Sequence, residues 1–439
     1  MTSADSLRAK IDDGTATVGV IGLGHVGLPL ALGFAGGGLS VLGFDTDPAK
    51  VETLEAGRSY LGHIADDSIV PFVERGRFRA TAEMDRLGEP DALLICVPTP
   101  LADDRRPDLS FVETTCEEIR RRLRSGQLVV LESTTYPGTT DEVVLPILER
   151  SGLVCSADFF VAYSPEREDP GNPHHRATTI PKVVAGLDDA ALDLAGRLYG
   201  HLTDRIVPVS STRTAEATKL FENVFRAVNI ALVNELKGVY EAMEVDIWEV
   251  LDAAETKPFG FMRFNPGPGW GGHCIPVDPF YLTWKADQHG VDSRFIELAG
   301  EINTEMPARV VTRLADALTE RGKRLDGSSI LLLGMAYKKN VADIRESPAL
   351  EILALLDQAG ATVDFHDPWI AEIPATRRHP TYEGKRSVPL TAEDLAARDA
   401  VVVVTDHDRI DFDLVARGAT LIIDTRGIYT RSSGDLVKA

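Results

Sequence analysis

Cys274 stands in sequence surroundings that suit a reactive thiol. It follows "NPGPGWGGH", a run whose glycines let the main chain close around a ligand. A thiolate becomes a strong nucleophile when nearby positive charge or a helix terminus lowers its pKa. The other cysteines are scattered without a C-x-x-C pair, so we expect no disulfide framework and no zinc site. They are predicted to be ordinary buried thiols: Cys96, Cys116 and Cys155.

Lys219 and Asn223 stand four residues apart in a segment with helical periodicity, so they share one helix face. Side by side, an ammonium and a carboxamide could stabilise a developing alkoxide or oxyanion. The alternative is a surface lysine whose stem packs on apolar neighbours, and spacing does not choose between the two. Asp278 lies four residues after Cys274 and would face the same side if the chain turns helical there.

A glycine-rich turn follows the first expected strand. "GLGHVG" carries Gly22, Gly24 and Gly27, which permit a tight turn, close approach of a pyrophosphate and close packing of helix on strand. The next strand ends in Asp45, whose carboxylate can bind ribose hydroxyls and would repel a 2′-phosphate. The combination predicts a site for NAD rather than NADP.

Three hydroxyl side chains are expected at the carboxyl edge of the same sheet, where ligands bind in open α/β folds: Thr99, Ser133 and Thr134. The alternative is that they only cap turns. If a hydride acceptor binds at this edge, the cysteine could act as a nucleophile in an oxidation. A sulfur adduct of an aldehyde can be oxidised to a thioester that water converts to a carboxylate, whereas simple alcohol oxidation needs no thiol.

The elements that would position these groups follow an alternating pattern. Strand-like runs alternate with helical patterns from residue 17 to about 208 and again from about residue 329. Between them we expect one long buried helix from Thr212 to about Ala254 and a second over residues 295–322. The predicted fold class is α/β, with two doubly wound Rossmann-like domains joined by a helical connector; one large sheet is the less favoured alternative. The expected domains are residues 1–209, 210–322 and 323–439.

Composition narrows the possible partners. The 439-residue chain has a formal charge of −21 and 44% hydrophobic residues, which is typical of a globular protein. No nucleic-acid partner is expected, because a phosphate backbone requires a concentrated basic surface. The sequence carries no secretory signal pattern and no apolar run long enough to span a bilayer, so we expect a cytoplasmic protein without a membrane partner.

Eight segments occur in order between about residues 16 and 430: "GVIGLGHVGLPLA", "FDTDPAKV", "LESTTYPGTT", "YSPEREDPGN", "EATKLFENVFRAVNIALVNEL", "GPGWGGHCIPVDPFYL", "GMAYKKNVADIRESPA" and "FHDP". Together they resemble the nucleotide-sugar 6-dehydrogenases, the UDP-glucose and GDP-mannose dehydrogenase family. The resemblance implies an NAD-dependent, four-electron oxidation of a sugar C6 alcohol to a uronic acid, with two NAD per substrate and no metal. It also implies a homodimer built by the long central helix.

The resemblance assigns roles to individual side chains. Cys274 would be the nucleophile, Lys219 and Asn223 would steady oxyanionic intermediates, and Asp278 would organise Lys219 and water. Glu166 would lie near the hydrolytic water, which Thr134 helps to hold. The implied cofactor site comprises Gly22, Gly24, His25, Val26, Gly27, Asp45, Thr99, Ser133, Thr134 and Arg345. The implied substrate site comprises Glu166, Arg167, Lys219, Asn223, Phe264, Asn265, Gly271, Tyr337, Lys338 and Arg426.

The expected sugar comes from the same resemblance. "ESTTYPGTT", "YSPEREDPGN" and "IPVDPFYLTWKA" are most similar to the bacterial UDP-N-acetylglucosamine 6-dehydrogenases of polysaccharide or specialised glycan biosynthesis, and Glu132 replaces a lysine of the UDP-glucose enzymes. UDP-glucose and UDP-N-acetylmannosamine are alternatives with the same chemistry. A two-electron hydroxyacid dehydrogenase would also use a lysine and an asparagine on a helix, but it leaves Cys274 and the third domain without a task. A ligand sensor that has kept the fold would be expected to lose the cysteine or Lys219.

Overall fold

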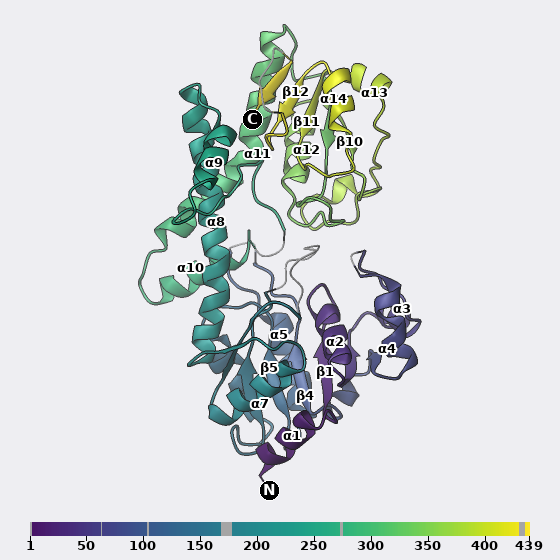
Figure 1. Cartoon of the computed structure of the whole chain (residues 1–439), viewed down its shortest axis with the longest axis vertical. Helices are drawn as coiled ribbons and strands as arrows, with labels where there is room; N and C mark the ends of the chain where they lie inside the picture. The colour runs from purple at the N-terminus through teal and green to yellow at the C-terminus, as the bar shows by residue number, and fades with distance from the viewer. Residues whose placement is uncertain (1, 63, 103–104, 168–177, 273–274, 430–434) are drawn as a thin grey trace. The chain divides into compact units, whose positions relative to one another are not determined.

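The computed structural model describes residues 2–62, 64–102, 105–167, 178–272, 275–429 and 435–439. The chain forms two compact units, which Figure 1 shows in one view. The first unit consists of Met1–Glu222 and Phe280–Asp292, and the second of Asn223–Pro279 and Ser293–Ala439.

An eight-stranded sheet forms the centre of the first unit, in the order β3-β2-β1-β4-β5-β6-β7-β8. Neighbouring strands run parallel except for β6 and β7, which are antiparallel. The doubly wound architecture is confirmed, but sequence patterns did not indicate β3 or the reversed direction of β7. The strands are β1 (Thr17–Ile21), β2 (Ser40–Phe44), β3 (Phe78–Thr81), β4 (Ala92–Ile95), β5 (Leu128–Leu131), β6 (Phe160–Tyr163), β7 (Lys182–Gly186) and β8 (Ile206–Pro208).

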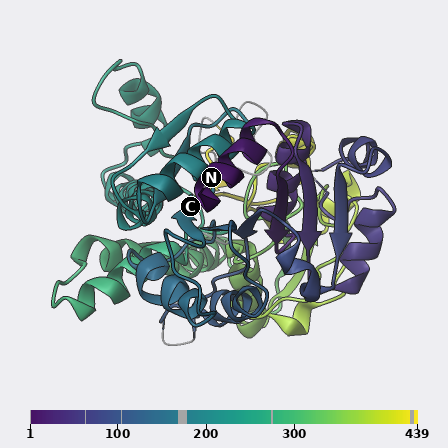
Figure 2. The ribbon, with the colours of Figure 1, turned by 90° about the horizontal axis from the view of Figure 1, so that it is seen from below.

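Helices cover both faces of this sheet (Figure 2). One face packs against α1 (Ser3–Asp12), α2 (Gly27–Gly36) and α7 (Asp189–Gly200), and the other against α5 (Ser110–Arg120) and α6 (Leu145–Glu149). Because both faces are buried, the strands are nearly continuous apolar runs, which made them visible in the sequence. The unit also contains α3 (Pro48–Glu55), α4 (Val70–Glu74) and the short helices η1 (Asp66–Ser68), η2 (Met84–Gly88) and η3 (Thr140–Val144).

The second unit contains a parallel five-stranded sheet in the order β10-β9-β11-β12-β13. One face packs against α11 (Arg294–Glu320) and α12 (Pro348–Gln358), and the other against α13 (Ala392–Ala396) and α14 (Phe412–Gly418). The strand-like runs expected from about residue 329 are confirmed, although the sequence pattern did not indicate β13. They are β9 (Ser329–Leu333), β10 (Thr362–His366), β11 (Ala400–Val403), β12 (Ile422–Asp424) and β13 (Leu436–Lys438); a short helix η4 (Pro380–Tyr382) follows β10.

The expectation of one long buried helix ending near Ala254 is wrong in two respects. Helix α8 (Thr212–Ala242) stops twelve residues earlier, and α9 (Ile247–Glu255) begins after a break. The break has a local cause: Glu244 adopts a left-handed φ of 59°, and the Asp246 carboxylate caps α9 by accepting a hydrogen bond of 3.0 Å from the Trp248 amide. One side of α8 is also exposed, with Phe221 70% accessible.

Two further helices complete the chain. The second predicted helix is confirmed as α11, which contains Pro307. Helix α10 (Asp278–Gln288) begins at Asp278, and sequence patterns did not predict it. No helix in the described residues is both long and apolar enough to span a membrane.

Candidate active site

The turn after β1 has the geometry of a phosphate-binding loop. Gly22 has a φ of 90°, and its amide donates to the Phe44 carbonyl at 2.8 Å. A Cβ at Gly27 would overlap the Gly22 carbonyl oxygen, whereas a Cβ at Gly24 would meet nothing within 4 Å. The first and third glycines therefore hold the turn, and the second leaves the backbone open to a pyrophosphate, with His25 and Val26 leading into α2.

Asp45 lies at the carboxyl end of β2, beside this loop. Its buried carboxylate accepts hydrogen bonds from the Leu23 amide at 3.1 Å and the Asp47 amide at 3.0 Å, and Lys50 Nζ lies 3.3 Å away. The strand order places β1 between β2 and β4, where the direction of winding reverses, and open α/β sheets bind dinucleotides at such a point. The open glycine turn and the adjacent carboxylate fit NAD.

The hydroxyl groups at the ends of β4 and β5 come together. Thr99 Oγ1 donates to the Thr134 carbonyl at 2.8 Å, and Ser133 Oγ donates to the Val97 carbonyl at 2.7 Å. Tyr281 from α10 donates to the Thr99 carbonyl. These bonds show the turn-stabilising role that the sequence left as an alternative, and each hydroxyl oxygen keeps lone pairs with which it can accept a hydrogen bond.

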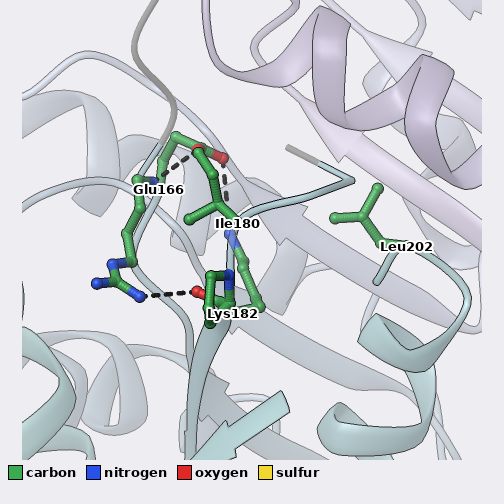
Figure 3. Close-up of a pocket in the computed structure, with 6 residues that line it drawn as sticks. Glu166, Ile180, Lys182 and Leu202 are labelled. Atoms are coloured by element: carbon green, nitrogen blue, oxygen red, sulfur yellow. Dashed lines mark hydrogen bonds and ion pairs between the residues drawn. The ribbon is translucent and has the colours of Figure 1, made fainter. Parts of the chain in front are cut away.

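Glu166 belongs to a buried cluster of charges in the first unit (Figure 3). Lys182 Nζ, at the start of β7, lies 2.8 Å from Glu132 Oε2 and 3.6 Å from Glu166 Oε2. Tyr199 donates to the other oxygen of Glu132. A cavity of about 10 Å³, lined by Glu166, Arg167, Ile180, Pro181, Lys182 and Leu202, has room for roughly one water beside the Glu166 carboxyl.

Burial governs protonation in this cluster. It raises the pKa of Glu132 to about 7, and the Glu166 carboxylate adds to that effect while Lys182 opposes it. Burial also disfavours the charge on Lys182, but the two carboxylates outweigh it, so the pKa of this ammonium is raised. One cation thus serves two carboxyl groups. Sequence reasoning missed Lys182; the available signal was Glu132 itself, because a carboxylate at the end of a buried strand requires a partner.

Arg167 is anchored rather than free. Its guanidinium makes two contacts with the Glu222 carboxylate, at 2.6 Å and 3.3 Å, and donates to the Pro181 carbonyl at 2.7 Å. Glu222 lies on α8 beside Asn223, so this pair fixes the loop after β6 to the long helix.

Helix α8 carries Lys219 and Asn223 one turn apart on one face, as predicted. Lys219 is half-buried. Asn223 is 6% exposed, and its Nδ2 donates to Asp278 Oδ2 at 2.6 Å. Asp278 is 3% exposed and opens α10, where the positive end of the helix dipole favours a negative charge. His273 and Cys274 lie outside the described residues.

The sugar-nucleotide candidates of the second unit also converge. Cβ atoms at Gly271 and Gly272 would lie 2.7 Å and 2.8 Å from atoms of Tyr337, so the loop packs on this ring only because both residues lack side chains. The Gly272 amide donates to the Arg345 carbonyl at 3.1 Å. Arg426 packs in the same way on Gly267 and donates from Nε to the Val404 carbonyl at 2.7 Å.

The remaining candidates lie on the same segments. Phe264 packs edge-on against Phe225 of α8 with ring centres 5.7 Å apart. Asn265 accepts a hydrogen bond of 2.9 Å from Arg263, and Lys338 follows Tyr337 after β9. Arg345 is bound to Asp343 at 2.6 Å. The structure therefore places Gly271 and Gly272 against Tyr337, gives Phe264 and Asn265 other partners, and pairs Arg345 with a neighbouring carboxylate.

The remaining cysteines differ in their burial. Cys96 and Cys116 are buried, and burial raises the pKa of Cys116 to about 12, which keeps it a thiol. Cys155 is only half-buried, so the expectation of three buried thiols is wrong for this one, which lies in the connection between α6 and β6 rather than inside a helix or strand. Within the described ranges no group of three or more His, Cys, Asp or Glu side chains could hold a metal.

Two Rossmann-like sheets and a glycine turn with an acidic partner define a dinucleotide-dependent dehydrogenase with a second ligand-binding domain. The UDP-glucose/GDP-mannose dehydrogenase family matches in three parts: its NAD binding domain over residues 16–203, its central domain over 213–305 and its UDP binding domain over 331–431. The chain belongs to this family and is an NAD-dependent nucleotide-sugar 6-dehydrogenase.

Individual relatives cover nearly the whole chain. UDP-N-acetyl-D-glucosamine 6-dehydrogenase of Pseudomonas aeruginosa is 36% identical over 392 residues, which is 89% of this chain and 90% of that protein. UDP-N-acetyl-D-mannosamine dehydrogenase of Escherichia coli K12 is 35% identical over 434 residues, covering 94% and 99%. The structure of UDP-D-ManNAc dehydrogenase from Pyrococcus horikoshii has a TM-score of 0.85 at 31% identity and covers 95% of this chain and 96% of that one.

Proposed function

We propose that the substrate is UDP-N-acetylglucosamine and that the product is the corresponding UDP-uronic acid. The observation that carries the choice of sugar is the similarity to the Pseudomonas aeruginosa protein and to a second UDP-N-acetyl-D-glucosamine 6-dehydrogenase, from Salmonella typhi, 34% identical over 394 residues. Tyr337, Lys338, Arg426 and the loop from Phe264 to Gly272 would hold the nucleotide and the sugar. NAD, when bound at the glycine turn, supplies the hydride acceptor for each of two oxidations.

The proposed chemistry passes through Cys274. The C6 alcohol loses a hydride and a proton to become an aldehyde, and the Cys274 thiol adds to the aldehyde carbon to form a thiohemiacetal. Loss of a second hydride and proton leaves a thioester. Water then adds to its carbonyl carbon, the C–S bond breaks, and the carboxylate and the thiol are released. Lys219 and Asn223 would stabilise the negative oxygen that arises in these steps.

Asp278 and Glu166 have supporting tasks in this scheme. The bond from Asn223 to Asp278 would hold the carboxamide in one orientation, so that no reorganisation is needed when charge develops. Glu166 borders a space of about 10 Å³, and a water held there would supply the hydrolytic step. The family resemblance gives Thr134 a part in holding this water. The cofactor roles of His25, Val26, Thr99, Ser133 and Arg345 belong to the same proposal.

The test of sugar and stoichiometry is a single assay. Purified protein is mixed with NAD and with each of UDP-N-acetylglucosamine, UDP-N-acetylmannosamine, UDP-N-acetylgalactosamine and UDP-glucose, while NADH is followed by absorbance. We expect the highest kcat/KM with UDP-N-acetylglucosamine and two NADH per molecule consumed. A preference for another sugar would contradict the choice of UDP-N-acetylglucosamine as substrate but not the proposed mechanism. One NADH per molecule would support a two-electron hydroxyacid type of reaction instead.

Cys274→Ala tests the covalent scheme. The variant should bind UDP and NAD with unchanged affinity and produce no uronate, and mass spectrometry of the quenched native enzyme should find the substrate attached to Cys274. Full uronate production by the variant would eliminate the thioester route.

A homodimer through α8 is part of the proposal. Four large apolar side chains are exposed along this helix at spacings of four, seven and seven residues, and a fifth follows directly after its last residue, which together form one stripe: Phe221, Phe225, Leu232, Val239 and Met243. An apolar stripe of this length marks an interaction surface, and a second α8 offers a matching one. We also propose the domain division 1–209, 210–322 and 323–439, and a cytoplasmic location, where NAD and UDP-sugars are available.

A further inference from the structure

A cavity of about 310 Å³ lies in the second unit. It is bordered by the last turns of α8, the start of α9, α11 and β13. None of its lining residues belongs to the proposed NAD or UDP-sugar site. Since a water takes up about 30 Å³ in the liquid, the space could hold roughly ten waters or one small organic molecule.

Most charges that line this cavity are already paired. Arg313 lies 2.5 Å from Glu241, and Lys438 is paired with Asp246. Glu244 also lines the cavity, but it is exposed to solvent. The remaining charged group is Lys237, which is 7% exposed. Its Nζ has no hydrogen-bond partner within the described part of the chain.

The other buried polar groups without partners at this cavity are donors as well. Arg313 Nε and Trp248 Nε1 find no acceptor among the described residues. Trp248 Nε1 points toward Gly427, where a Cβ would overlap the indole, so its ring forms a wall of the cavity. Lys438 and Lys237 stand 4.9 Å and 5.9 Å from the centre of this ring. The unpaired groups of the cavity are therefore hydrogen-bond donors beside an aromatic surface, while its carboxylates are those of Glu241, Glu244 and Asp246.

Such an arrangement is costly unless something accepts from it. Burial removes the hydration of the Lys237 ammonium, and the nearby Glu241 and Asp424 carboxylates compensate its charge only in part, so the pKa of Lys237 stays lowered. Water would satisfy the hydrogen bonds of Lys237 but would add no negative charge beside it. A phosphate or a carboxylate would do both, because it accepts several short hydrogen bonds and carries the opposite charge.

We propose that this cavity binds a small phosphate- or carboxylate-bearing molecule, whose oxygens accept hydrogen bonds from Lys237 Nζ and Arg313 Nε and whose remaining atoms rest against Trp248. This would be a second ligand site, additional to the sites for NAD and the UDP-sugar. It depends on none of the proposed catalytic roles.

The test uses the full chain saturated with NAD and UDP, so that both expected sites are filled. Thermal midpoints are measured with inorganic phosphate, ribose 5-phosphate and citrate, each against sodium chloride of equal ionic strength. At least one anion should raise the midpoint of the native protein saturably by several degrees. Full stabilisation by inorganic phosphate identifies a free anion, whereas a stronger response to ribose 5-phosphate or citrate identifies an organic phosphate or a carboxylate.

Lys237→Met is the decisive variant, with Lys257→Met as its matched control because Lys257 is exposed in the same unit. Lys237→Met should have a higher midpoint than the native protein without anion and should not respond to the anion, while Lys257→Met should respond like the native protein. Equal responses in all three proteins, or none beyond the chloride reference, would overturn the site and leave a water-filled cavity.

A second measurement does not depend on a variant that folds. Brief treatment of the native protein with acetic anhydride, followed by peptide mass spectrometry, reports the reactivity of each lysine. The stabilising anion should protect Lys237 at least several-fold and leave Lys257 unprotected. Unchanged labelling of Lys237 would contradict the proposal.

Discussion

Asn223 donates a hydrogen bond of 2.6 Å to Asp278, and the two residues are 6% and 3% exposed. The bond joins the middle of α8 to the first residue of α10, so two elements far apart in the sequence hold one carboxamide in place. Since a carboxamide that is already oriented can stabilise a developing oxyanion without reorganising, the bond gives the proposed chemistry a structural basis.

Asn223→Asp should reduce turnover strongly, because it replaces the donor with a carboxylate facing Asp278. We expect a fall in kcat of about 10²–10³, the usual effect of losing one oxyanion donor. Steady-state kinetics with NADH detection measures it. Gln288→Glu, an amide-to-carboxylate change at the exposed end of α10, should retain activity. Normal kcat in Asn223→Asp would assign the Asn223–Asp278 bond to folding alone.

Lys182→Met should destabilise the first unit by roughly 3–5 kcal/mol, because it leaves Glu132 and Glu166 buried without their cation. The loss is measured by urea unfolding. Adding Glu132→Gln to Lys182→Met should recover much of it, since the strongest uncompensated charge is removed. If the two substitutions are simply additive, the cluster is not coupled as its distances suggest.

Asp45→Asn should weaken discrimination between NAD and NADP, because the carboxylate that repels a 2′-phosphate is neutralised. The quantity to measure is kcat/KM with NAD divided by kcat/KM with NADP, and this ratio should fall at least tenfold. Asp47→Asn is the control: this neighbouring carboxylate caps α3 by accepting from the Ala49 amide at 2.9 Å, and its loss should leave the ratio unchanged. If Asp45→Asn changes this ratio no more than Asp47→Asn does, Asp45 does not discriminate between the two cofactors.

Lys237 should make stability rise with pH. Burial lowers its pKa from 10.5 to about 8, so between these values the unfolded chain binds a proton that the folded chain does not. Stability should therefore increase from about pH 8 to pH 10.5 by up to about 3 kcal/mol from this group. Unfolding of native protein and of Lys237→Met across this range isolates the contribution, which should vanish in the variant. The charged groups that face Lys237 are Glu241, Arg313, Asp424, Arg426 and, across Trp248, Lys438.

The exposed stripe of α8 can be tested by charge. Phe221→Glu combined with Leu232→Glu should convert the proposed dimer to a monomer, because two carboxylates from each copy would be buried together. Light scattering coupled to size-exclusion chromatography gives the mass directly. Phe111→Glu, at an equally apolar and exposed position on α5, should leave the mass unchanged. A native protein that is already monomeric would refute the dimer.

Groups close together in the sequence could be assigned before the structure was known. The glycine turn with Asp45 and the shared face of Lys219 and Asn223 follow from spacing, because strand and helix geometry convert short spacings directly into positions. Buried parallel strands were recognisable as apolar runs for the same reason. The boundary between α8 and α9 was not, since apolar periodicity continues through it while Asp246 and Glu244 break the helix.

Partnerships between distant residues were decided only by the tertiary structure. Lys182 and Glu132 are 50 residues apart, and Arg167 and Glu222 are 55 apart. No feature of the local sequence around one residue of a pair identifies its partner. The unpaired Lys237 is an extreme case: in the sequence it is one lysine on a long helix, and only the packing of α9, α11 and β13 around it removes water from its ammonium. Sequence determines which local geometry each group adopts, whereas burial and charge pairing depend on which surfaces the folded chain brings into contact.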